Sequence, residues 1–400
     1  MELLSQAVQR LRPSATLAVT ARAAELRAAG RDVIGLGAGE PDFDTPDHIK
    51  DAAIAAIRRG ETKYTKVDGT PALKEAVIAK FRNENGLAYG PDEVIVSTGG
   101  KQVIFNALAA SVDPGDEVII PAPYWVSYPE IVAFAGGVPK IVATTIEDDF
   151  KLTPEALEAA ITPKTKWLIF NSPSNPTGAA YTAEEMRALG AVLARHPHVY
   201  VLSDEIYEHL VYDDFAFVSF AAANPDLFDR VLTVNGVSKA YAMTGWRIGY
   251  AGGPKTLVRA MAKLQGQSTS NPCSIAQAAA VAALTGPQAF LADWRQTFSA
   301  RRNLVVERLT AIPGITCRRP EGAFYVFPQV SALIGRKTPA GETLADDLML
   351  ARWLLEEAEV AVVPGTAFGA RGYMRISYAT ATELLEDACR RMAEAIGGLQ

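Results

Sequence analysis

The sequence VYVLSDEIY at residues 199–207 contains the stretch that decides the fold of this chain. Its first five residues, VYVLS, show no polar alternation, which is typical of a strand buried on both faces of a parallel sheet. Asp204 follows directly and is expected at the carboxyl end of that strand, where open α/β sheets bind their ligands. Six further short runs indicate strands, at 93–97, 117–121, 139–143, 167–171, 231–235 and 247–251.

Helical patterns separate these runs, for example at 101–111, 182–195 and 254–265. Alternation of strands and helices predicts an α/β fold with a mostly parallel central sheet that is covered on both faces. From about residue 286 the pattern changes to a long helix at 288–311, a helix at 345–357, a strand at 374–378 and a final helix from Thr382. We therefore expect a large domain over 46–286 and a smaller, discontinuous α+β domain from 1–45 and 287–400, because 400 residues exceed one compact core.

Composition excludes several classes of protein. A hydrophobic fraction of 49% and a charged fraction of 21% are those of an ordinary globular protein. The net charge of −6 gives no basic field for nucleic acid, and no apolar run approaches the ~20 residues of a membrane span. Cys273, Cys317 and Cys389 are scattered and odd in number, which favours reduced thiols and a cytoplasmic location. The four histidines form no metal-binding motif, so no metal site is expected.

The sequence SKAYAMTGWRIGY at 238–250 carries the strongest chemical signal. Lys239 lies among small and apolar residues, where desolvation disfavours its charged form and leaves an amine that can form an imine with an aldehyde. Arg247 follows on the same stretch, and its planar fork of donors suits a phosphate. Together they point to pyridoxal 5′-phosphate, an aldehyde that carries a phosphate. For the pair alone, a snorkelling lysine and a salt-bridged arginine remain an alternative.

Two strand ends add groups that suit the pyridine ring. A buried Asp204 needs a positive partner, and a protonated ring nitrogen would be one, while Tyr207 could donate to the ring oxygen. The plainer interpretation is a helix-capping aspartate followed by a core tyrosine. Asn175 lies in NSPSNPTG at 171–178, where prolines and a glycine fix the backbone, so its amide could donate to the same oxygen.

Three further features are ambiguous by themselves. Gly99 and Gly100 join a strand to a helix, an arrangement that lets backbone amides approach an anion. Trp125 could stack on a flat ring, although a core tryptophan is the commoner meaning. Arg375 could bind a substrate carboxylate or form a structural salt bridge.

Taken in order, these motifs resemble the class I, fold-type I aminotransferases of the aspartate aminotransferase family. The resemblance runs from about Arg12 to the C-terminus and includes GAGEPDF at 37–43 and RISYA at 375–379. It implies that Lys239 binds the cofactor covalently and shuttles a proton between the substrate α-carbon and the cofactor C4′. The same resemblance implies that the pyridine nitrogen pairs with Asp204 and that the ring oxygen is bonded by Asn175 and Tyr207.

The resemblance also implies the remaining contacts. Trp125 stacks on the ring and contributes to the substrate site. The phosphate is held by Gly99, Gly100, the backbone at Lys101, Arg247 and Ser238. Tyr64 reaches the phosphate of a neighbouring subunit, so a homodimer with shared active sites is expected. The substrate α-carboxylate is bound by Arg375, Gly39 and Asn175.

Within the family the chain is most similar to the aspartate/prephenate aminotransferases, through RPSATLAVT at 12–20 and Lys101. In that subgroup the residues matching Thr16 and Lys101 contact the distal acidic group of the substrate. The sibling aspartate enzymes use an arginine of the other subunit, and no equivalent of it is apparent here. A dicarboxylate needs a second cation beyond Arg375, and Lys101 is available for that purpose.

The expected activity is a ping-pong transfer of an amino group between aspartate or glutamate and the 2-oxo acids oxaloacetate and 2-oxoglutarate, with prephenate as an additional acceptor. An aminotransferase for aromatic or neutral amino acids and a carbon–sulfur β-lyase are the alternatives. A non-catalytic regulator that binds the cofactor would need a DNA-binding domain, for which the first thirty residues offer no room.

Overall fold

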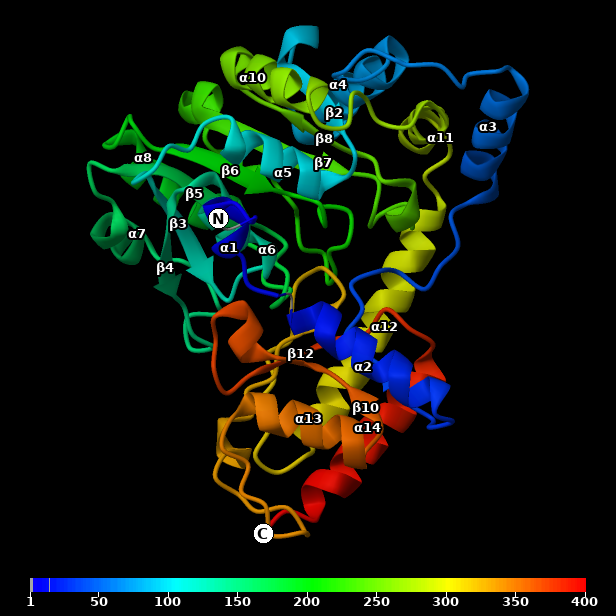
Figure 1. Cartoon of the computed structure of the whole chain (residues 1–400), viewed down its shortest axis with the longest axis vertical. Coiled ribbons are helices and arrows are strands. Elements are labelled where there is room, and N and C mark those ends of the chain that lie inside the picture. The colour runs from blue at the N-terminus through cyan, green and yellow to red at the C-terminus, as the bar shows by residue number, and fades with distance from the viewer. Residues whose placement is uncertain (1–2, 14) are drawn as a thin grey trace.

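The predicted strands form one seven-stranded sheet in the computed structural model, which describes residues 3–13 and 15–400, with the backbone alone for 15–17. Its strands β3 to β7 run parallel, and β8 is antiparallel to both β7 and β2. In spatial order they are β2 (Val94–Ser97), β8 (Gly249–Gly252), β7 (Val231–Gly236), β6 (Tyr200–Asp204), β5 (Thr165–Asn171), β3 (Glu117–Ala122) and β4 (Val138–Ala143) (Figure 1). The prediction of a mostly parallel α/β sheet is confirmed.

One expected strand boundary is wrong. The run at 247–251 was expected to begin a strand at Arg247, but β8 begins at Gly249. Arg247 ends the short 3-10 helix Thr244–Trp246 and adopts a left-handed backbone with φ of 58°. This conformation is incompatible with extended pairing, and it is uncommon for a residue other than glycine.

Helices cover both faces of the sheet, as a parallel sheet requires. One face packs against α5 (Gly100–Ala109), α6 (Ser127–Ala135) and α10 (Lys255–Gly266). The other packs against α3 (Asp47–Arg58), α4 (Pro71–Asn85), α7 (Pro154–Ala160), α8 (Ala183–Ala194), α9 (Phe220–Ala223) and α11 (Ser274–Thr285). Local sequence fixes some of the helix starts: the Thr182 hydroxyl accepts from the Glu185 amide, and the Glu185 carboxylate accepts from the Thr182 amide.

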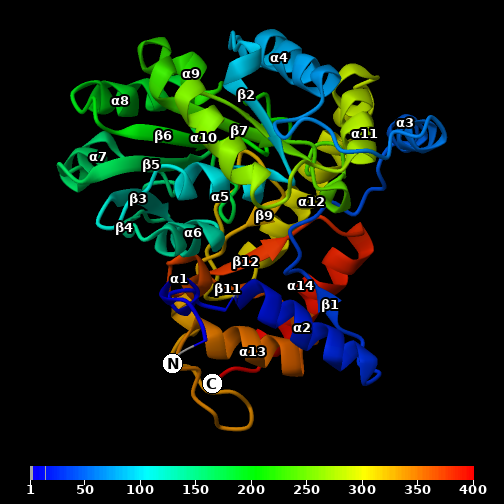
Figure 2. The ribbon, with the colours of Figure 1, turned by 45° about the horizontal axis from the view of Figure 1, so that its top comes forward.

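The C-terminal part forms a second core, into which the long α12 (Phe290–Thr310) descends (Figure 1). It contains the sheet β11 (Val363–Pro364), β12 (Met374–Ser377) and β9 (Tyr325–Val326), with α13 (Asp347–Glu357) and α14 (Thr382–Gly397). The N-terminal β1 (Ile34–Gly35) pairs with β10 (Val360–Ala361), and α2 (Ala15–Ala28) packs beside α13 in both views (Figure 2). The domain boundaries at 46–286, 1–45 and 287–400 stay a prediction.

The first helix lies against the large sheet layer instead. In α1 (Gln6–Gln9) and the residues that follow, Arg10 donates to the Ala133 and Phe134 carbonyls, and the Arg12 amide donates to Glu130. The N-terminal segment therefore bridges α6 and the C-terminal core.

Within residues 3–13 and 15–400, no single helix has the length and apolar character needed to cross a membrane. Helices α11 and α12 together have the length and apolar composition of a membrane span, but the chain bends by 86° between them.

A buried ionic cluster ties α4 to the segment after β6. Lys80 and Glu208 are 3% and 5% exposed, and their side chains form an ion pair. Asn85 donates to Glu208 over 2.7 Å, and Glu84 and His209 lie at the rim of the cluster. Since the ammonium of Lys80 forms ion pairs with both Glu208 and Glu84, we interpret the cluster as a structural link that fixes the residue next to Tyr207.

We predict that Lys80→Met destabilises the protein by about 3–5 kcal/mol, because it leaves Glu208 buried without its cation. The measurement is urea unfolding of the cofactor-loaded protein. Lys255→Met, which breaks the exposed ion pair with Asp92, is the matched control and should leave the midpoint unchanged. Adding Glu208→Gln to Lys80→Met should recover part of the loss. Equal midpoints for Lys80→Met and the control would contradict the structural role.

Candidate active site

A cavity of about 420 Å³ opens at the carboxyl ends of the central strands. The ends of β5, β6 and β7 meet at one edge of the sheet, so side chains from three separate sequence segments face it. Its lining includes Gly39, Glu40, Gly100, Lys101, Trp125, Tyr128, Asn171, Asn175, Asp204, Tyr207, Ser238, Lys239, Thr244, Arg247, Tyr325 and Arg375. Several separate segments of the sequence thus converge on one pocket, and most of the predicted site residues line it.

Lys239 projects into this cavity from the segment after β7. Its Nζ donates to the Gly39 carbonyl over 2.5 Å, and the side chain is partly buried. Desolvation, and next the positive charge of Arg375, lower the pKa of Lys239 to about 8. Compared with an ordinary lysine, a much larger fraction of this amine is therefore neutral near neutral pH, and the neutral amine is a nucleophile and a base.

Asp204 lies at the end of β6 and is 6% exposed. Its Oδ2 accepts from the Tyr128 hydroxyl over 2.6 Å and its Oδ1 from the Ile206 amide over 3.3 Å. Burial raises the pKa of Asp204, while the Tyr128 hydrogen bond opposes that rise. A carboxylate held in this way is suited to accept from a protonated ring nitrogen, which would supply the missing positive charge.

Arg375 is part of strand β12 and contributes a further wall of the cavity. Its side chain is buried, and the residue is 2% exposed. Its guanidinium donates to Asn175 Oδ1 over 2.9 Å and to the Gly37 carbonyl over 2.6 Å. Among the residues that the structure describes, no carboxylate forms an ion pair with Arg375, and its Nε has no hydrogen-bond partner. A desolvated guanidinium of this kind is suited to an incoming carboxylate.

Two tyrosines complete this wall. The hydroxyls of Tyr207 and Tyr325 lie 2.9 Å apart, and the Tyr325 ring lies 4.6 Å from the guanidinium carbon of Arg375. Because Oδ1 of Asn175 accepts from Arg375, the amide nitrogen is the group left to donate toward the cavity.

Gly99, Gly100 and Arg247 form an anion cradle. Gly99 has φ of +86°, and a Cβ on it would lie 2.3 Å from Arg247 Nη2. Gly100 begins α5, so backbone amides at the start of a ten-residue helix face the cavity beside Arg247. Ser238 is buried in the same lining. This set of donors fits a phosphate.

Lys101 and Trp125 flank the cradle. The Lys101 Nζ lies 4.9 Å from the Trp125 ring, although the lysine as a whole is solvent-exposed. Partial desolvation and the charge of Arg247 lower the pKa of Lys101. It is therefore a second cation at this pocket, and the described residues give it no ion-pair partner.

Among the predicted site residues whose side chains the structure describes, Tyr64 and Gly99 do not line the cavity. Tyr64 is 91% exposed and does not line the cavity. Thr16 lies in α2, but its side chain falls outside the described residues. Gly99 underlies Arg247 without lining the cavity itself.

Tyr128 and Tyr325 also line the cavity, although neither is among the residues predicted from the sequence. Tyr128 follows Trp125 at helical spacing and could have been linked to it, but its contact with Asp204 spans 76 positions. Tyr325 meets Tyr207 across 118 positions, and no local pattern signals that contact.

Comparisons with known proteins agree with this geometry. The model of the family "Aminotransferase class I and II" matches residues 31–392. An aspartate/prephenate aminotransferase of Cereibacter sphaeroides is 62% identical over 399 residues, covering 100% of both chains. The crystal structure of the Rhizobium meliloti aspartate aminotransferase has a TM-score of 0.97 at 55% identity, with 100% of each chain covered. The Thermus thermophilus aspartate aminotransferase with maleate has a TM-score of 0.92 at 50% identity, covering 99% of this chain and 100% of that one.

The reactive lysine, the buried aspartate, the anion cradle and the unpaired guanidinium all suit the cofactor of this family. The chain belongs to the class I and II aminotransferases, and it is a pyridoxal-phosphate-dependent enzyme.

Proposed function

We propose that this enzyme transfers the amino group between aspartate or glutamate and the 2-oxo acids oxaloacetate and 2-oxoglutarate, and that it also accepts prephenate. The observation that carries the proposal is the pair of cations, Arg375 and Lys101, that face one cavity without a carboxylate partner among the described residues. Two cations that line one small pocket suit a substrate with two acidic groups.

The chain's own residues account for binding and proton transfer. Arg375 binds the α-carboxylate, and Asn175 holds the guanidinium in place. Bound pyridoxal phosphate supplies an electron sink for charge that develops at the substrate α-carbon. Lys239 is the base for the α-proton, because its lowered pKa of about 8 leaves a neutral fraction near neutral pH. Asp204 keeps its negative charge against the ring nitrogen with help from Tyr128.

Lys101 and Thr16 are the residues that we assign to the distal acidic group. The name of the Cereibacter sphaeroides relative includes prephenate, a feature that supports prephenate as a second acceptor for this chain. Prephenate would yield arogenate.

Tyr64 supports a homodimer with shared active sites. The tyrosine is 91% exposed, and Ile54 and Ile57 of α3 are 43% and 53% exposed nearby in sequence. A neighbouring subunit would cover these apolar side chains and receive the Tyr64 hydroxyl at its phosphate. The free state of Cys273, Cys317 and Cys389 supports a cytoplasmic location.

The test of the substrate is a steady-state competition between oxaloacetate and prephenate, with glutamate as donor and the cofactor-loaded enzyme. Comparable kcat/KM values for the two acceptors would support the dual activity. If the enzyme turns over oxaloacetate alone, prephenate is not one of its substrates. Turnover of neither, with activity on phenylpyruvate or release of ammonia and pyruvate from a cysteine conjugate, would favour the aromatic aminotransferase or the β-lyase.

We predict that Lys101→Ala lowers kcat/KM for dicarboxylates roughly ten- to hundredfold more than for alanine or phenylalanine, because a charge-assisted hydrogen bond is lost. Steady-state kinetics with aspartate and with the neutral amino acids measures this difference. Equal losses for acidic and neutral substrates would contradict the assignment to the distal group.

Replacing Lys239 by alanine should abolish transamination and the visible absorbance of the lysine–cofactor imine together. Among the residues that the structure describes, Lys101 is the one other lysine that lines the cavity. Absorbance spectra and coupled assays check both. Retention of either property would remove Lys239 from its role, and Lys101→Ala is the control that should keep the absorbance.

Tyr128→Phe should weaken cofactor binding about tenfold or more, since it removes a hydrogen bond to a charged Asp204. Titration of the cofactor-free enzyme with pyridoxal phosphate, followed by absorbance, measures the dissociation constant. Tyr124→Phe, which changes a tyrosine just before α6 that does not line this cavity, is the matched control. An unchanged constant in Tyr128→Phe would show that the Ile206 amide alone is sufficient.

A further inference from the structure

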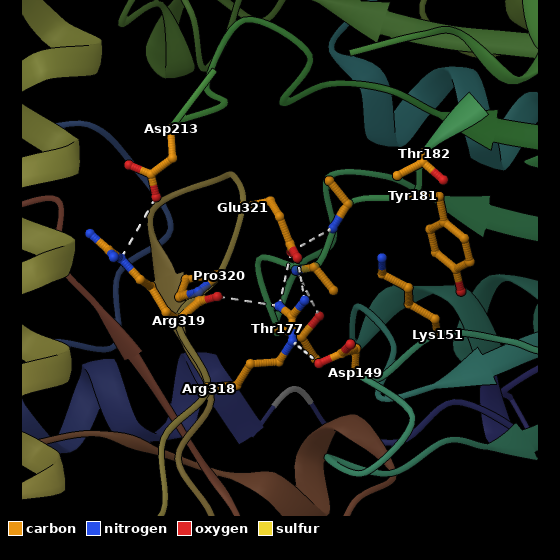
Figure 3. A network of polar contacts seen from close by, with 12 residues as sticks. Asp149, Lys151, Thr177, Tyr181, Thr182, Asp213, Arg318, Arg319, Pro320 and Glu321 are labelled. Atoms are coloured by element: carbon orange, nitrogen blue, oxygen red, sulfur yellow. Dashed lines mark hydrogen bonds and ion pairs between the residues drawn. The ribbon is translucent and has the colours of Figure 1, made fainter. Parts of the chain in front are cut away.

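Residues 318–325 connect the C-terminal core to the active site, and a dense polar network holds them (Figure 3). This segment ends at Tyr325, whose hydroxyl and ring contact Tyr207 and Arg375. Ala323 within it has φ of 58° and no solvent exposure, so its backbone is held in a conformation that a residue with a Cβ disfavours. Such a segment needs external contacts to keep its shape.

Arg318 joins two parts of this network. Its Nη1 donates to Glu321 Oε2 over 2.9 Å, its Nη2 pairs with the other Glu321 oxygen, and its Nε donates to Asp149 over 2.5 Å. The Arg318 side chain is 15% exposed, whereas that of Asp149 is 59% exposed. Figure 3 shows the guanidinium between the two carboxylates. The turn between β4 and α7 is thereby tied to residues 318–321.

Glu321 extends the network to the turn that carries Asn175. Its Oε2 also accepts from the Ala180 amide over 3.2 Å, and the next amide, that of Gly322, donates to the Gly178 carbonyl over 2.9 Å. The two backbones approach so closely that a Cβ on Gly178 would lie 2.5 Å from Pro320 Cβ. Segment 318–325 and the turn 171–181 therefore form one unit.

This unit positions two residues that line the active site. The turn 171–181 carries Asn175, which accepts from Arg375, and segment 318–325 carries Tyr325, on whose ring the same guanidinium packs. A change in the contact between the two segments would shift Asn175 relative to Tyr325, and both are contacts of Arg375.

We propose that Arg318 and Glu321 are positioning residues for the carboxylate-binding site: their ion pair fixes segment 318–325 on the turn 171–181 and so sets the geometry of Asn175 and Tyr325 around Arg375. The inference rests on the proposed function only in taking Arg375 as the group that binds the substrate carboxylate. Neither residue lines the cavity, so both act through others.

The test uses the cofactor-loaded enzyme and maleate as a non-reacting dicarboxylate, with its dissociation constant read from the cofactor absorbance. Glu321→Gln and Arg318→Gln should each raise that constant about tenfold, a size typical of coupling within one network, while kcat changes much less than KM for aspartate. Arg319→Gln is the matched control, because Arg319 contacts Asn303 and Asp213 and not the turn. It should leave the constant unchanged.

Two further measurements test the proposal if Glu321→Gln or Arg318→Gln folds poorly. Asp149→Asn removes only the ion pair between Arg318 and the exposed Asp149. It should raise the dissociation constant of maleate by a smaller factor, and added salt should abolish this difference from the wild type. Hydrogen exchange without any ligand should be faster at the Ala180 and Gly322 amides in Glu321→Gln, and unchanged there in Arg319→Gln.

Unchanged maleate binding and unchanged exchange in both Glu321→Gln and Arg318→Gln would overturn the proposal, as would an equal effect of Arg319→Gln. A wild-type enzyme that binds maleate but transaminates no dicarboxylate would contradict the proposed function alone, since binding and exchange would still report on the contact.

Discussion

The buried guanidinium of Arg375 is the constraint around which the site is built. A charge removed from water needs polar or aromatic partners, and the described residues provide a carbonyl, an amide oxygen and two aromatic rings, but no carboxylate in ion-pair range. In the function that we propose, the carboxylate of the substrate supplies the missing negative charge. Burial of Arg375 without a carboxylate therefore lowers the folding stability of the protein, and it leaves the guanidinium free to bind an anion.

The same electrostatic arrangement explains the other titratable groups. Arg375 adds to the desolvation that lowers the pKa of Lys239, so the residue that we propose binds the substrate also favours the neutral form of the lysine. Burial raises the pKa of Asp204, whereas the Tyr128 hydrogen bond, the Ile206 amide and the positive charge of Lys239 all favour its charged form. The positive groups Lys101, Lys239, Arg247 and Arg375 and the buried carboxylate of Asp204 thus line the same cavity.

The C-terminal core contributes the side chains of Arg375 and Tyr325 to this site. Arg375 comes from β12 and Tyr325 from β9, two adjacent strands of one small sheet. The remaining contacts to the large sheet layer include the turn 171–181 and the segment 318–325. Because these contacts are polar and partly exposed, their ion pairs are suited to adjusting the site without rebuilding a core.

The sequence by itself determined the parallel sheet and the residues that follow its strands. Buried runs without polar alternation predicted β3 to β7, and Asp204, Asn175 and Lys239 each come soon after such a run, so chain order placed them at one edge. Tertiary structure decided the rest. The Tyr128–Asp204 and Tyr207–Tyr325 contacts span 76 and 118 positions, and Arg375 meets Asn175 across 200. The antiparallel direction of β8 and the left-handed Arg247 also depend on packing against distant strands. A local pattern records which face of an element is buried, whereas the partner on that face is chosen only when the chain closes on itself.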